Sequence, residues 1–439
     1  MAWAIARLPL LASLRRLLGG GHGVPQSMQA PILFSSLVAA AYCAGACGQV
    51  AATDQQRRNV LVITVDGLRA DRVGAYGHEP SLTPHLDRLS EESVRYAYAL
   101  APAPWAAPSF AALWAGRYPS ELGFTDLERP LAGEIQTLPE AMGAAGWETG
   151  AVISHPFAAE QTGLDQGFAE WTEVDGSDRK QGASDTLVTA AAVELLEDYK
   201  GSPFLAWVQY SGLRLPFEQE VRDPSYQGPI RPHQSRAELL RLAPTLNLDD
   251  RAHLDALYSA ELAQVDREIG ALLAVLEEQN IRSSTVVIVT APHGCEILER
   301  GGIGDAGTLH DEIVRVPFLL HIPGGRSGVI PDPVSLVDLA PTMRRVLELE
   351  PDPLTSGLCV LPGSSSPERA LFSETNRAYD LRAVLDGDWK LIVDRRNQQS
   401  ELFDVFDDPA EVKNAGDTRG LMRDRLEREL ATFEDRLSK

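Results

Sequence analysis

Two polar side chains that can take part in metal or acid–base chemistry follow apolar, β-branched segments of the chain. Asp66 comes directly after residues 60–65, and His293 comes soon after residues 285–290. A carboxylate and an imidazole at neighbouring strand ends can hold one cation between them. Each also has an ordinary structural explanation, because an aspartate can cap the helix that follows it and a histidine can be satisfied within a loop. Both are therefore candidate metal ligands.

The elements that must position these residues alternate between strand and helix. Apolar runs with the length of buried strands occupy residues 60–65, 204–208, 285–290 and 318–322. Between the second and third runs, apolar residues recur at steps of three or four from Leu254 to Leu276, which predicts a long amphipathic helix that ends near Asn280. This alternation predicts an α/β fold with a large central, mostly parallel sheet flanked by helices. The chain has no internal repeat.

The composition changes after residue 350. Residues 351–367 are rich in proline, glycine and serine, which is typical of a boundary or a long loop. Beyond this segment, residues 382–393 are consistent with a hairpin and residues 421–437 with a charged helix. We therefore expect a main α/β domain over residues 54–350 and a small C-terminal α+β subdomain over residues 351–439.

The first 53 residues contain three arginines and no acidic residue. The apolar stretch at 32–46 has the length of a signal-peptide core and is short for a membrane-spanning helix. Residues 1–47 are thus predicted to be an export signal that directs the protein to the periplasm or cell envelope. Small residues precede Cys47, as in a lipoprotein cleavage box, so Cys47 is a candidate lipidation site and membrane anchor. Plain secretion and an uncleaved anchor are the alternatives.

The overall charge bears on the class of partner. The chain of 439 residues has 40 Lys and Arg against 62 Asp and Glu, a formal net charge of −22. This balance argues against nucleic acid as a partner, because phosphate backbones are bound by basic patches. Four cysteines are too few for a disulfide scaffold.

Ordered motifs cover nearly the whole chain after the export segment. They include NVLVITVDGLRADRVGAYG at 59–77, PWAAPSFAALWAGRYPSELGF at 104–124, TLHDEIVRVPFLL at 308–320, SLVDLAPT at 335–342 and ELFDVFDDPAEVKN at 401–414. In these motifs the chain resembles the sulfatases of the alkaline phosphatase superfamily. The resemblance implies hydrolysis of sulfuric or phosphoric esters by an oxygen nucleophile, usually a formylglycine made within C/S-x-P-x-R. It also implies a divalent cation, commonly calcium, as cofactor.

The nucleophile position departs from the family pattern. Aligning Pro108 and Ser109 with the Pro-Ser of the motif places Ala106 at the nucleophile and Phe110 at the arginine. A methyl group has no lone pair with which to attack sulfur or phosphorus. Formylglycine-type catalysis is therefore not expected of this chain.

The metal ligands implied by the resemblance are also reduced in number. Pro292 stands where the family has a carboxylate beside His293, and Gly67 follows Asp66 at a second position where some family branches also lack a carboxylate. Asp66 and His293 are the ligands that remain. Because calcium prefers six to eight oxygen ligands, we expect it to bind weakly or not at all.

The proton donors implied by the resemblance are missing. Gln209, Arg214, Arg300 and Asp305 occupy positions at which relatives tend to carry histidines. The guanidinium groups of Arg214 and Arg300 suit a sulfate or phosphate anion, but they do not donate protons to a leaving group at neutral pH.

The leading hypothesis is an exported, catalytically impaired sulfatase-family protein that binds a sulfated or phosphorylated ligand or serves as a scaffold. The alternative is an active ester hydrolase that uses a divalent metal and an atypical nucleophile. Ser109 is the nearest hydroxyl and lies near the start of a predicted helix, whose dipole favours an alkoxide, although it can equally bond to the backbone. A third hypothesis is a metal-bound water held by Asp66 and His293.

Overall fold

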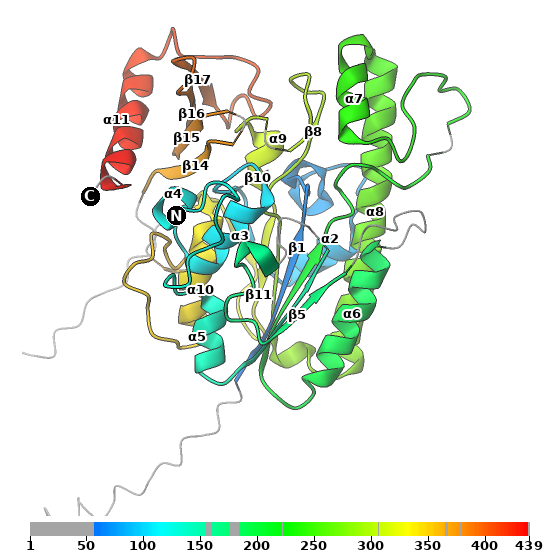
Figure 1. The fold of residues 1–439 in the computed structure, drawn as a ribbon, viewed down its shortest axis with the longest axis vertical. Helices are drawn as coiled ribbons and strands as arrows, with labels where there is room; N and C mark the ends of the chain where they lie inside the picture. Colours follow the sequence, from blue (N-terminus) through cyan, green and yellow to red (C-terminus); the bar gives the residue numbers. More distant parts are fainter. Residues whose placement is uncertain are drawn as a thin grey trace, which may run out of the picture. The chain divides into compact units, whose positions relative to one another are not determined.

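A mixed eight-stranded sheet forms the centre of the main domain (Figure 1). The computed structural model describes residues 57–154, 160–174, 184–221, 223–305, 307–364, 368–377 and 379–437. Across the sheet the strands are β12 (Gly328–Ile330), β2 (Val94–Tyr96), β11 (Phe318–His321), β7 (Thr285–Thr290), β1 (Asn59–Val65), β6 (Phe204–Tyr210), β4 (Glu148–Ile153) and β5 (Glu170–Glu173). The predicted export segment 1–47, including Cys47, lies outside the described residues.

The parallel part of the sheet runs from β7 to β5, and β11 pairs antiparallel with both β7 and β2. All seven residues of β1 are buried, as expected for an apolar, β-branched strand that is covered on both faces. Val65 of β1 pairs with Tyr210, and Thr64 pairs with Thr290. The carboxyl ends of these three strands therefore meet, and the predicted mostly parallel α/β architecture is confirmed.

Helices cover both faces of the sheet (Figure 1). One layer contains α2 (Pro84–Glu91), α6 (Ser184–Asp198) and α8 (Leu248–Glu278), and the other contains α3 (Ala106–Ala115), α5 (Leu138–Ala144) and α10 (Leu339–Val346). The side chain of Asn247 caps α8 by accepting hydrogen bonds from two backbone N–H groups of its first turn. Asn280 has a left-handed φ of 57° just after the helix, so the predicted end of this helix is confirmed.

The C-terminal subdomain is a four-stranded antiparallel sheet packed against one helix (Figure 1). Its elements are β14 (Leu371–Thr375), β15 (Leu381–Asp386), β16 (Trp389–Asp394), β17 (Gln399–Asp404) and α11 (Gly420–Leu437). Phe372 and Phe433 stack at 4.2 Å between ring centroids, which fixes α11 to the sheet. The predicted hairpin and terminal helix are confirmed, and the domain boundary at residue 350 stays a prediction.

Short elements complete the main domain. They are α4 (Pro119–Leu122), α7 (Arg236–Leu242), α9 (Asp311–Val314), the small sheet of β10 (Arg315–Val316), β3 (Ala99–Leu100) and β13 (Val334–Ser335), and the pair of β8 (Glu296–Ile297) and β9 (Ile303–Gly304). Within the described ranges, no helix has the length and apolarity needed to cross a bilayer.

Candidate functional site

The predicted strand-end residues lie where β1, β6 and β7 terminate side by side. Asp66 follows β1, has no exposed surface, and donates its backbone N–H to the carbonyl of Tyr210 at 3.0 Å. Gly67 donates its N–H to the carbonyl of His293 at 3.1 Å. The structure thus brings the segments of Asp66 and His293 together, because their strands are neighbours of the same parallel sheet.

Arg214 reaches the same place from the loop after β6. Its Nε atom lies 4.0 Å from Oδ2 of Asp66, with side chains 22% and 0% exposed respectively. A carboxylate taken out of water is stable only when it is paired or hydrogen-bonded. Arg214, which the sequence identified as an anion-binding candidate, therefore already compensates the charge of a buried acid.

His293 is buried and faces a small cavity of about 110 Å³. Its Nδ1 atom lies 2.7 Å from the carbonyl oxygen of Gly294 and donates to it, because a carbonyl oxygen only accepts. Among the described residues Nε2 has no hydrogen-bond partner. Cys295 lines the same cavity, and burial raises the pKa of its thiol to about 12, so this sulfur stays protonated.

These residues do not fit a calcium ion. Asp66 is the carboxylate kept at the family's ligand positions, Pro292 has no donor atom in its side chain, and the positive charge of Arg214 stands 4.0 Å from Asp66. In the part of the chain that the structure describes, no group of three or more His, Cys, Asp or Glu is arranged to hold a metal ion. A hard cation prefers six to eight oxygen ligands, which this donor set does not supply.

The position that the sequence motif aligns with the nucleophile is buried. Ala106 is the first residue of α3, and both Ala106 and Ser109 have no exposed surface. The Ser109 hydroxyl donates a hydrogen bond to the carbonyl of Ala103 at 2.9 Å. This contact gives Ser109 a backbone-satisfying role at the start of the helix, the structural explanation that the sequence left open.

Phe110, which the sequence motif aligns with the family's arginine, belongs to the core. Its ring packs edge-on against Trp207 at 4.8 Å between centroids, and Trp207 packs in the same way against Trp114 at 5.2 Å. These contacts hold α3 against the sheet through apolar burial. The side chain of Phe110 therefore has a packing role in this structure.

Gln209 stands at the end of β6, where relatives tend to carry a histidine. It is fully buried, and its Oε1 atom accepts the backbone N–H of Ser154 at 2.9 Å while Nε2 donates to the carbonyl of Tyr210 at 2.8 Å. The Oε1 atom therefore joins the end of β6 to the residue after β4, while Nε2 bonds within β6 itself. An amide in this position gives no proton to a leaving group.

A larger cavity of about 930 Å³ opens beside the strand ends, between α7, the β8–β9 pair and the loop before β15. Four guanidinium side chains line it, from Arg214, Arg236, Arg300 and Arg377. With Glu296 and Asp305 as the acidic residues of the lining, the cleft has a net charge of +2. We call this cavity the arginine cleft. Arg236 and Arg377 were not identified from the sequence, because neither belongs to a recognisable motif. Only the fold brings α7 and the segment after β14 to the same cleft.

The guanidinium of Arg236 is held in the arginine cleft by two backbone carbonyls. Its Nε donates to the carbonyl of Ile303 at 2.8 Å and its Nη2 to the carbonyl of Asp305 at 3.1 Å. Both partners are neutral, and no carboxylate among the described residues lies within ion-pair distance of this guanidinium. The positive charge of Arg236 is therefore oriented but not neutralised.

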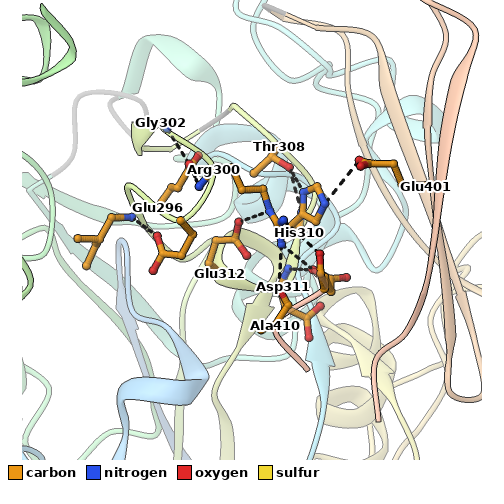
Figure 2. Close-up of polar contacts among 12 residues, drawn as sticks. Glu296, Arg300, Gly302, Thr308, His310, Asp311, Glu312, Glu401 and Ala410 are labelled. Carbon is orange, nitrogen blue, oxygen red and sulfur yellow. Dashed lines mark hydrogen bonds and ion pairs between the residues drawn. The ribbon is translucent and has the colours of Figure 1, made fainter. Parts of the chain in front are cut away.

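Arg300 belongs to a dense polar network at the edge of the arginine cleft (Figure 2). Its Nε donates to Oε1 of Glu312 at 2.8 Å, and its Nη1 and Nη2 donate to the carbonyls of Glu411 and Ala410 at 3.2 and 3.1 Å. Arg300 therefore ties the segment before α9 to the segment after β17. Because its donors are occupied, it is less suited to hold a ligand than Arg236.

His310 lies in the same network (Figure 2). Its Nδ1 atom contacts the hydroxyl of Thr308, and its Nε2 atom lies 3.6 Å from Oε2 of Glu401. Burial, with the positive charges of Lys390 and Arg300, lowers the pKa of His310 to about 2. His310 is therefore neutral at physiological pH and is not a general acid there.

Lys390 joins the two parts of the fold beneath this network. It is fully buried on β16, and its Nζ lies 2.7 Å from Oδ1 of Asp311 and 2.9 Å from Oε1 of Glu411. Burial raises the pKa of Glu411 to about 7, against the opposing effect of Lys390. This ion-pair triad holds the C-terminal subdomain against α9 and so fixes one wall of the arginine cleft.

The sheet, its two helical layers and the strand-end site define an α/β protein of the alkaline phosphatase-like class. A family model for sulfatases matches residues 58–349, which is more than half of the chain. The chain belongs to the sulfatase family, whose members generally use a divalent metal, commonly calcium.

Individual relatives are distant. The chain is 24% identical to the uncharacterized sulfatase YidJ of Escherichia coli, with 84% of this chain and 86% of that protein covered. It is 24% identical to human iduronate 2-sulfatase, with 62% and 61% covered. Among solved structures, BT4656 in complex with its substrate D-glucosamine-2-N,6-O-disulfate matches at a TM-score of 0.72 and 19% identity, with 87% of this chain and 98% of that chain covered. The phosphonate monoester hydrolase of Agrobacterium radiobacter matches at 0.72 and 19%, with 87% and 96% covered. These likenesses support the fold.

Proposed function

We propose that this sulfatase-family protein binds a sulfated or phosphorylated saccharide in the arginine cleft and does not hydrolyse it. The observation that carries the proposal is the net charge of +2 on the cleft lining, in a chain whose formal net charge is −22. Guanidinium groups match the oxygens of sulfate and phosphate through paired N–H donors. A positive cleft in an acidic protein selects anions locally.

The size and surface of the arginine cleft suit a saccharide. Its volume of about 930 Å³ is within the range of small-molecule sites. Tyr379 lines it with 48% of its surface exposed, which offers an aromatic face to a sugar ring. One structural neighbour, BT4656, was solved with a sulfated glucosamine, which supports the same ligand class for this chain.

The absence of turnover is proposed from the chemistry of the closed positions. Ala106 has no atom that can attack an ester, and loss of a nucleophile typically costs about 10⁶ in kcat. The alternative nucleophile, Ser109, is buried and donates to a backbone carbonyl. A metal-bound water at Asp66 and His293 is disfavoured by the guanidinium of Arg214 beside Asp66. With residues 1–47 as an export signal, the ligand is met in the periplasm or cell envelope.

The test is calorimetric titration of the purified protein with defined sulfated oligosaccharides and with the same oligosaccharides after desulfation. Arg236→Gln removes the available guanidinium, and Arg241→Gln on the same helix is the matched control, because Arg241 is exposed and donates to the carbonyl of Ala237. Loss of a charged hydrogen bond costs about 1.5–3 kcal/mol, so we expect affinity to fall about 10- to 100-fold in Arg236→Gln only.

Two results would contradict the proposal. One is equal binding of sulfated and desulfated oligosaccharides, which would exclude recognition of the anion. The other is release of inorganic sulfate or phosphate by the wild-type protein, measured by ion chromatography, at a rate well above that of a mock preparation from cells lacking the protein.

A further inference from the structure

The ion pair between Arg214 and Asp66 lies at the position where the sequence resemblance implies the family's cation. Asp66 is fully buried at the end of β1, and its Oδ2 atom is 4.0 Å from Nε of Arg214. Arg214 keeps 22% of its side chain exposed and lines both the small cavity and the arginine cleft. One side chain thus connects a buried negative charge with the ligand-accessible surface.

The backbone around this pair is closely packed. Gly67 has φ of 81°, and a Cβ atom added there would lie 3.0 Å from the carbonyl oxygen of Leu213. A carboxylate-bearing residue at position 67 would therefore be strained and would displace the loop that carries Arg214. Because Leu213 directly precedes Arg214, the lack of a side chain at Gly67 allows the loop to bring Arg214 beside Asp66.

We propose that the guanidinium of Arg214 takes the place of the family's divalent cation as the permanent positive charge at Asp66. A cation entering this site would be repelled by the guanidinium and would find one family carboxylate instead of the six to eight oxygens that calcium prefers. The site is therefore metal-independent: its charge is built into the chain. This inference concerns charge compensation and holds whether or not a saccharide binds.

The first experiment measures the metal on the full-length wild-type protein. After exposure to excess Ca²⁺ and Mg²⁺ and exhaustive dialysis, we expect far less than one equivalent of either metal by plasma mass spectrometry. We also expect the same melting temperature in EDTA and in CaCl₂. Stoichiometric metal, or a wild-type melting temperature that rises with Ca²⁺, would overturn the proposal.

The second experiment is a mutant cycle on the ion pair. Arg214→Met keeps much of the side-chain length and removes the positive charge that lies 4.0 Å from Asp66, so we expect the melting temperature to fall by about 5 °C or more. Asp66→Asn in the same chain removes the stranded charge and should restore most of the loss. The exposed Arg241→Met is the control and should leave the melting temperature unchanged.

The cycle separates charge from packing. If Asp66→Asn gives no recovery in the Arg214→Met background, the role of Arg214 is packing and the proposal is wrong. If Arg214→Met does not fold, recovery of folding in the double variant supports the proposal and failure of both variants opposes it. None of these readouts uses a saccharide, so their failure is distinguishable from failure of the binding proposal.

Discussion

Replacing Asp185 with asparagine removes a titrating carboxylate from beneath the loop that carries Arg214. Asp185 lies in the first turn of α6, and its Oδ1 atom accepts the backbone N–H of Ser211 at 3.4 Å. Burial, reinforced by the negative charge of Glu261, raises the pKa of Asp185 from 3.8 to about 7. Arg214 follows Ser211 by three residues, so the hydrogen bond from Ser211 to Asp185 anchors the start of the loop that carries Arg214.

The sign of the effect follows from the direction of the shift. Because the pKa is higher in the folded protein than in the unfolded chain, the folded state holds this proton more tightly. The free energy of unfolding that protonated Asp185 contributes is complete below about pH 4 and is lost as the pH rises through about 7. A shift of roughly three units corresponds to about 4 kcal/mol in total, of which about 2.5 kcal/mol is lost between pH 5 and pH 8.

Asparagine imitates the protonated carboxyl and does not titrate. We therefore expect Asp185→Asn to gain about 2.5 kcal/mol of unfolding free energy relative to the wild type between pH 5 and pH 8. Urea unfolding followed by tryptophan fluorescence at both pH values measures this difference. The control is Asp198→Asn at the exposed end of α6, which removes the same formal charge.

A difference between Asp185→Asn and the wild type that is the same at both pH values would refute this reasoning. It would mean that Asp185 is ionised in the folded protein throughout this range. A pH-dependent gain of equal size in Asp198→Asn would instead assign the effect to net charge, since a general reduction of negative charge acts on any acidic protein.

Two further predictions concern the buried polar contacts. Lys390→Met should cost about 3–5 kcal/mol of unfolding free energy, because Asp311 and Glu411 are left without their cation; the cost should shrink from pH 8 to pH 5 as Glu411, whose pKa is raised to about 7, takes up a proton. Urea unfolding at the two pH values checks it, and an unchanged midpoint contradicts it. Ser109→Ala should cost about 1 kcal/mol through loss of the bond to Ala103 and leave saccharide binding intact; a catalytic role would instead appear as loss of sulfate release in ion chromatography.

The sheet was predictable because its signal is local. The run at 60–65 is mostly apolar and rich in β-branched residues, and β1 is buried along its whole length, from Asn59 to Val65. The strands β2 and β12 carry weaker patterns, because each has three residues and lies at or near the edge of the sheet. Their pairing is determined by tertiary contacts that the sequence does not express.

The positions of site residues at strand ends could be predicted from the sequence, whereas the positions of site residues outside the central strands could not. Asp66 and His293 could be placed together because parallel strands expose their carboxyl ends at one edge. Arg236 and Arg377 are more than a hundred residues apart and meet only through the fold of α7 and the loop after β14. The pairing of Arg214 with Asp66 was likewise invisible, because residue type alone does not say which acid an arginine will meet.

The departures from the family pattern are linked through the charge of Asp66. An uncompensated buried carboxylate costs several kcal/mol, against a total stability of about 5–15 kcal/mol for a typical protein, so this residue tolerates loss of a cation only if another positive group reaches it. The guanidinium of Arg214 lies 4.0 Å from Asp66. The loop that carries Arg214 passes close to Gly67, where a Cβ atom would lie 3.0 Å from the carbonyl oxygen of Leu213. Phe110 and Gln209, which the sequence comparison placed at chemical positions, take part here in packing and in hydrogen bonds. Both side chains are satisfied in these contacts, whereas Nε2 of His293 has no hydrogen-bond partner among the described residues. The satisfied contacts at the two positions agree with the binding role that we propose.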